Sequence, residues 1–131
     1  MSLGDELRYL RARAGGPSPA EIAEACGVDA GLYRQLEQRY REMGEDETLL
    51  KLSVYFGCET ALLKHARSRS RKALSAHLAE AQERDEQIQL RLRTGETLQG
   101  HVAWWDMGAI GLHPDDAGTL IVLQRHAVVD W

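Results

Sequence analysis

Basic side chains gather in one short stretch of the sequence, residues 64–72, which reads KHARSRSRK. The five cations are Lys64, Arg67, Arg69, Arg71 and Lys72. Such a cluster is typical of a surface that contacts the phosphate groups of a nucleic acid. A solvated helix end is the alternative interpretation, and the residue types alone leave both open.

The other reactive residue types form no catalytic pattern. We find no nucleophile beside a base, no paired carboxylates for acid–base work and no phosphate-binding loop. Four of the five histidines, at residues 65, 77, 101 and 113, stand apart at spacings that suit no metal site. Cys26 and Cys58 lack a CxxC spacing and are expected to be small buried hydrophobic residues. We therefore expect no enzyme activity, no metal and no cofactor.

Charge is distributed unevenly along the 131 residues, whose formal net charge is −4. Up to Lys72 there are 12 Lys and Arg against 11 Asp and Glu, whereas from Ala73 onward there are 4 against 9. This split predicts two domains, 1–66 and 73–131, joined by a basic linker at 67–72. No apolar run approaches the roughly 18 residues of a membrane span, and no signal-peptide core is present. A cytoplasmic protein without membrane contact is expected.

Apolar residues keep helical spacing from residue 3 to about residue 66, which predicts a small bundle of helices. One helix should begin after Ser18 as N-cap, with Pro19 at its first position and Glu21 completing a capping box. Gly27 should end this helix, because glycine allows the left-handed backbone of a tight turn. Ala23, four residues earlier, would let the next helix approach closely.

The turn at Gly27 between these two predicted helices resembles the phage-repressor/Cro-type helix-turn-helix. The resemblance covers residues 3–63 and includes GVDAGLYRQLE at 27–37 and ETLLKLSVYFGC at 47–58. The resemblance implies that the third helix enters the major groove of DNA, where Arg34 and Gln35 would contact bases. The DNA-binding residues that it implies are Ala30, Gly31, Arg34, Gln35 and Arg39. A helical unit kept for assembly or partner contacts is the alternative.

The pattern changes to alternating apolar and polar residues after a short predicted helix at 72–86. Five strands are expected at 88–94, 97–105, 109–113, 119–123 and 127–131, which suggests a small, strongly bent barrel. Gly100 would let the long second strand bend, and one of the tryptophans at 104 and 105 would face the core. Asp106 suits the turn that follows, because its carboxylate can accept backbone N–H bonds.

Two separated motifs in this half resemble the Sm domain of bacterial Hfq proteins, over about residues 73–131. The first motif comprises Gly95, Leu98, Gln99, Gly100, Val102, Trp105, Asp106, Ile110 and Leu112. The second motif is RHAV at 125–128, which is similar to the Lys-His-Ala-Ile signature of Hfq. The predicted fold class is therefore α+β. An all-α helix-turn-helix bundle is followed by a short helix and a five-stranded, strongly bent Sm-like β-barrel.

The Hfq resemblance implies a closed ring, usually of six subunits, in which the fourth strand of one subunit pairs with the fifth strand of the next. The apolar segments TLIVL and AVVDW agree with this, since exposed edge strands invite aggregation and ring closure removes them. In the family, a lysine–histidine pair lines the central pore and binds uridine-rich RNA. Its counterparts here are Arg125 and His126, with Met107 at the position of a pore glutamine. A turn residue that holds the loop between strands is the alternative for His126.

Together these patterns predict a non-catalytic regulator that binds single-stranded, uridine-rich RNA at a ring, with DNA as a second candidate ligand at its helix-turn-helix units. Arg91 replaces the tyrosine with which the family binds adenine-rich RNA on the opposite face. The alternative is an oligomeric scaffold that binds protein partners and whose nucleic-acid surfaces have decayed.

Overall fold

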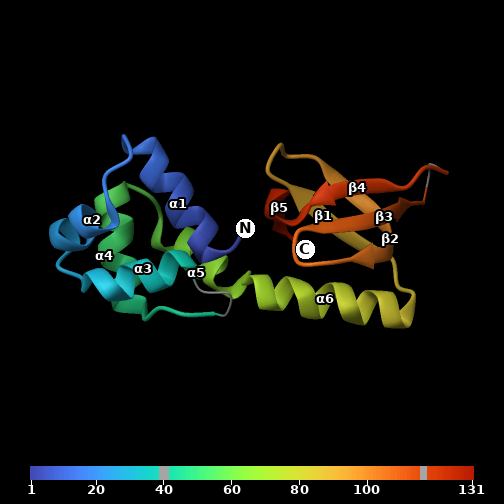
Figure 1. Cartoon of the computed structure of the whole chain (residues 1–131), viewed down its shortest axis with the longest axis horizontal. Coiled ribbons are helices and arrows are strands. Elements are labelled where there is room, and N and C mark those ends of the chain that lie inside the picture. Colours follow the sequence, from blue (N-terminus) through green and yellow to red (C-terminus); the bar gives the residue numbers. More distant parts are fainter. Residues whose placement is uncertain (39–41, 116–117) are drawn as a thin grey trace. The chain divides into compact units, whose positions relative to one another are not determined.

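The computed structural model describes residues 1–38, 42–115 and 118–131. Helices come first and a strongly curled, antiparallel sheet follows (Figure 1), so the predicted α+β class is confirmed. The chain divides into two compact units. We call Ser2–Ser70 the helical unit, and Arg71–Trp131 together with Met1 the sheet unit. No helix in the described ranges has the length and apolar character needed to cross a membrane.

The helical unit contains α1 (Leu3–Arg13), α2 (Pro19–Cys26), α3 (Ala30–Gln38), α4 (Asp46–Phe56) and α5 (Thr60–Ser68). The predicted start of α2 is confirmed. The Ser18 hydroxyl accepts a hydrogen bond from the Glu21 amide at 3.2 Å, and the Glu21 carboxylate accepts one from the Ser18 amide at 2.7 Å. Gly27 follows α2 with a left-handed backbone (φ 68°), as its place in the pattern predicted. Leu63 and Ala66 of α5 join the core of this unit.

A buried polar cluster ties α1 to α3. Arg11 donates two hydrogen bonds to the Glu37 carboxylate, at 2.8 and 3.2 Å, and the Tyr33 hydroxyl donates a third at 2.7 Å. Burial and the Glu37 carboxylate raise the pKa of Tyr33, while hydrogen bonding to Glu37 raises the pKa of Arg11. The two helices also approach closely at Gly4, where a Cβ would lie 2.5 Å from the Glu37 carbonyl oxygen. Only glycine fits that position without moving α3.

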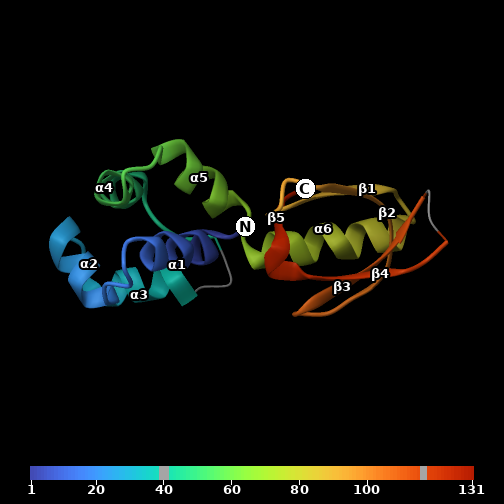
Figure 2. The same cartoon turned by 90° about the horizontal axis from the view of Figure 1, so that it is seen from above.

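The sheet unit begins with α6 (Arg71–Arg84), which packs along the curled sheet (Figure 2) through Leu74, Leu78 and Ala81. The strands are β1 (Ile88–Leu92), β2 (Thr97–Trp105), β3 (Ala109–Pro114), β4 (Ile121–Gln124) and β5 (Val128–Asp130). A short 3-10 helix, η1 (Arg125–Ala127), connects β4 to β5. The strand order is β4-β3-β2-β1-β5, so β4 and β5 are the two edges. The second core lies between α6 and the inner face of the sheet.

Two local features of β2 shape the sheet. Gly100 lies between Ile88 of β1 and Pro114 of β3, and a Cβ there would overlap the backbone carbonyl of His113. The missing side chain therefore permits a close approach of β2 and β3 at the predicted bend. Between Val102 and Trp104 the register with β3 shifts by one residue, as in a β-bulge. The shift turns Trp104 outward and brings Trp105 against the core.

Candidate nucleic-acid surfaces

Arg125 lies inside the sheet unit, with a relative exposure of 6%. Its guanidinium donates to the carbonyl oxygens of Asp106 (2.9 Å) and Arg71 (2.8 Å) and to the Ser75 hydroxyl (2.8 Å). The same group lies 5.8 Å from the centre of the Trp105 ring. Arg125 therefore connects the start of α6, the end of β2 and η1. The resemblance implied an RNA contact at this residue, whereas these bonds give its guanidinium an internal structural role.

The turn between β2 and β3 is held by Asp106, as its place in the sequence predicted. Its carboxylate accepts backbone hydrogen bonds from Gly108 at 2.7 Å and Ala109 at 2.8 Å. These bonds, with a smaller contribution from the charge of Arg125, hold the pKa of Asp106 below its usual range. The Gly108 carbonyl in turn accepts a hydrogen bond from the Arg125 amide at 3.0 Å. The turn and η1 are thus held side by side.

The other two predicted pore residues, Met107 and His126, are exposed. The Met107 sulfur lies 3.9 Å from the Arg125 guanidinium, so Arg125 joins the turn that carries Met107 to the 3-10 helix that carries His126. The His126 backbone carbonyl accepts a hydrogen bond from Arg93 at 3.0 Å. The structure therefore places the predicted trio in one region of the sheet unit, with only Met107 and His126 exposed.

The basic cluster at 64–72 does not act as one uniform surface. Arg67 donates to the Asp46 carboxylate at 2.8 Å and to the Gly44 carbonyl at 2.9 Å, and Lys64 lies 3.6 Å from Asp46. These cations hold the pKa of Asp46 below its usual range, the hydrogen bond from Arg67 contributing most. Lys64 and Arg67 thus join α5 to the start of α4. Arg69 is half-buried after α5, and the exposed Arg71 and Lys72 begin α6.

Helix α3 presents Gly31, Arg34 and Gln35 on its exposed side, opposite the buried Tyr33 and Leu36. Ala30 is half-buried against the core of the helical unit. The Asp29 carboxylate accepts a hydrogen bond from the Leu32 amide at 2.9 Å, so it caps the start of α3. Arg39, the fifth residue implied for DNA contact, lies outside the described ranges.

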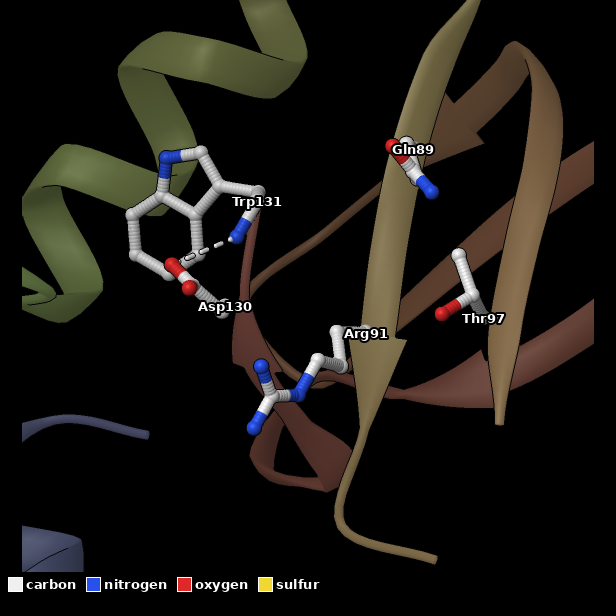
Figure 3. A pocket seen from close by; sticks show the side chains of 5 residues that line it. All are labelled: Gln89, Arg91, Thr97, Asp130 and Trp131. Carbon is white, nitrogen blue, oxygen red and sulfur yellow. Dashed lines mark hydrogen bonds between the residues drawn. The ribbon is translucent and has the colours of Figure 1, made fainter. Parts of the chain in front are cut away.

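A pocket of about 280 Å³ on the sheet unit contains residues that the sequence patterns did not assign together (Figure 3). Gln89 and Arg91 of β1 and Thr97 of β2 line one side, and Asp130 and Trp131 line the other. Arg91 is exposed and forms no ion pair with any carboxylate that the structure describes. The alternation of 88–92 already placed Gln89 and Arg91 on the outer face. The nearness of Asp130 and Trp131 follows only from the pairing of β1 with β5.

The cysteine, histidine and carboxylate side chains in the described ranges form no further candidate functional site. Cys26 and Cys58 were expected to be buried, but they are half-buried free thiols that pack against the edge of the helical core, and burial raises the pKa of both. Within the described ranges, no three His, Cys, Asp or Glu side chains are arranged to hold a metal ion. Comparison with protein-family models, with curated proteins and with solved structures finds no match for the chain.

Proposed function

We propose that the chain is a cytoplasmic, non-catalytic nucleic-acid-binding regulator. In this proposal the sheet unit assembles into a ring that binds single-stranded RNA, and the helical unit contacts duplex DNA through α3. The proposal rests on the open strand order, since β4 and β5 are left as two edges of one strongly curled sheet. A curled sheet whose two edges both need partners favours head-to-tail assembly of identical chains.

The edge strands support assembly by their residue types. β4 reads IVLQ and β5 reads VVD, so neither strand carries the lysine or proline that commonly protects a free edge. Val122 of β4 is 60% exposed, although it is a large apolar side chain. Pairing β4 of one copy with β5 of the next would satisfy the backbone groups of both edges and close a ring.

Exposed groups on two surfaces are the candidates for RNA contact. His126 and Met107 lie near Arg125, and a ring would repeat them around one axis. The pocket that contains Gln89, Arg91 and Trp131 offers an exposed amide, an exposed cation and a half-buried indole that also stacks with His77. These groups suit base edges, phosphate and base stacking. Arg125 itself is assigned a positioning role here, because its guanidinium is engaged within the unit.

Assembly can be tested on the full chain by native mass spectrometry and light scattering. We expect a closed oligomer, with six copies as the expected number. Val122→Lys should shift it toward smaller species, because a charge would lie on the edge strand. Gln99→Lys adds the same charge to the central strand β2, where it is also exposed, and should leave the oligomer intact. A monomeric wild-type chain would remove the basis of the ring.

Nucleic-acid binding can be tested by fluorescence anisotropy with labelled uridine-rich RNA, adenine-rich RNA and random duplex DNA at about 50 and 200 mM salt. His126→Ala should lower the preference for uridine-rich RNA, and Arg91→Gln should weaken RNA binding. Each lost phosphate contact should flatten the single-strand salt slope by roughly 0.7. Arg34→Ala should weaken duplex binding alone. Arg84→Ala, an exposed cation at the end of α6, is the matched control.

An oligomeric scaffold is the second candidate. The burial of Arg125 favours it, since the counterpart of the family's pore lysine is internal. The charge balance from Ala73 onward, with 4 basic against 9 acidic residues, also disfavours polyanions. Intact rings that bind none of the three probes at about 50 mM salt would establish the scaffold as the better proposal.

A further inference from the structure

The helical unit contains a groove of about 700 Å³ that neither proposed nucleic-acid surface uses. Helix α1 forms one wall with Tyr9 and Leu10. The end of α4 supplies Tyr55 and Phe56, and α5 supplies Leu62. The volume falls within the range of pockets that bind small organic molecules, roughly 300 to 1,000 Å³.

Large apolar side chains from three helices remain exposed around this groove. Tyr9 is 42% exposed, Tyr55 38% and Leu62 41%. The Tyr55 and Phe56 rings pack edge to face, with their centres 5.0 Å apart, which holds one wall in a defined shape. Exposed apolar surface gathered in a hollow is typical of a binding site rather than of ordinary protein surface.

The two charged groups of the groove differ in how accessible they are to a ligand. Arg13 ends α1 with its guanidinium 5.7 Å from the centre of the Tyr9 ring and 3.4 Å from the Tyr9 hydroxyl. Arg13 is exposed and pairs with no carboxylate in the described ranges. Glu6 also lines the groove but is only 7% exposed, and its charge is felt by the Cys58 thiol within the same hollow. A cation is therefore accessible beside the Tyr9 ring, while the anion of the groove is covered.

We propose that this groove binds a small amphipathic carboxylate, an acid with an aromatic or aliphatic body. The apolar body lies against Tyr9, Tyr55 and Leu62, and the carboxylate meets Arg13, away from Glu6. Charge complementarity selects an anionic end group, because the exposed ion of the groove is a guanidinium, which hydrogen-bonds carboxylates well. This site is independent of the ring and of nucleic-acid binding.

The test uses the full chain and the fluorescent probe 1-anilinonaphthalene-8-sulfonate, an aromatic body with an anionic group. We expect saturable binding of one probe per chain, displaced by decanoate at a lower concentration than by decanol. Leu62→Gln should weaken probe binding about fivefold or more. Arg13→Gln should abolish the preference for decanoate over decanol while the probe still binds.

Two matched controls locate the effect. Val54→Gln changes a 75% exposed residue on α4 that does not line the groove, and Leu120→Gln changes a 36% exposed residue of the sheet unit. Both should bind the probe as the wild type does. Unchanged affinity in Leu62→Gln, or an unchanged preference for decanoate in Arg13→Gln, would overturn the proposal. If probe affinity falls as protein concentration rises, a second copy of the chain occupies the groove. That result would also overturn the proposal.

Discussion

Arg125 holds three parts of the sheet unit together. Its guanidinium binds the start of α6 and the end of β2, and its backbone amide binds the turn before β3. Arg125→Ala should lower the free energy of unfolding of the sheet unit by about 2–4 kcal/mol, because buried acceptors lose a charged donor. Urea titration followed by tryptophan fluorescence reports on this unit, since Trp104, Trp105 and Trp131 all belong to it.

Arg84→Ala removes an exposed arginine of α6 and serves as the control, with an expected change within about 0.5 kcal/mol. Equal stability of the two variants would contradict the structural role of Arg125 and return its guanidinium to the candidates for RNA contact.

Asp106 gives the sheet unit a stability that depends on pH. Backbone hydrogen bonds from Gly108 and Ala109 lower its pKa in the folded state. The stabilisation is therefore present above the ordinary Asp pKa of about 3.9 and is lost as pH falls through the lower folded value. Asp106→Asn cannot titrate, so its stability should change less than that of the wild type between about pH 5.5 and pH 3. Tryptophan-monitored melting at both pH values measures the difference, and parallel losses would contradict it.

At the scale of elements, the contact between α1 and α3 depends on one buried carboxylate. Glu37→Ala should destabilise the helical unit by about 2–4 kcal/mol, since it leaves the Tyr33 hydroxyl and Arg11 without their acceptor. Glu47→Ala, which removes an exposed carboxylate 3.6 Å from Lys51, should cost at most about 1 kcal/mol. Urea titration followed by far-ultraviolet circular dichroism compares the two. A similar loss of stability in both variants would show that the buried cluster stabilises the helical unit no more than an exposed ion pair does.

The bulge in β2 leads to a second prediction at this scale. The Trp104 indole lies over Gly111 of the neighbouring strand, so a Cβ at Gly111 would overlap the ring. Gly111→Ala should displace Trp104, shift tryptophan emission to longer wavelength and destabilise the sheet unit by about 1–3 kcal/mol. Gly108→Ala is the matched control, because the nearest atom to its Cβ, Asp106 Oδ1, is 3.6 Å away. Identical spectra for Gly111→Ala and wild type would refute this packing.

At the scale of the whole molecule, the two units have separate hydrophobic cores. We expect two unfolding transitions, because each unit buries its own apolar residues and the described core clusters share none. Leu49→Ala, in the core of the helical unit, should lower the free energy of the unfolding transition seen by circular dichroism by about 2–5 kcal/mol. The tryptophan transition should stay where it is. A single transition, displaced equally for both probes, would mean that the units fold as one.

Much of this architecture is encoded in short stretches of the sequence. The capping box of Ser18 and Glu21, the left-handed Gly27 and the Asp106 turn each depend on residues within four positions of one another. The α+β class and the strand positions follow from apolar periodicity, which is also local. The outward direction of Gln89 and Arg91 is set by the same alternation. Local hydrogen bonds and steric preferences act similarly in any surrounding fold, so the sequence alone determined these features.

Contacts between distant residues were decided only by the tertiary structure. Arg11 and Glu37 are 26 positions apart, and Arg125 and Ser75 are 50 apart. In the sequence, these side chains are typical of surface cations and polar groups. Only the packing of the folded chain shows that they are partly or fully buried. Which tryptophan faces the core depends on a one-residue register shift between β2 and β3. Because side chains alternate along a strand, one extra residue reverses every assignment beyond it, and periodicity gives no sign of where that residue is inserted.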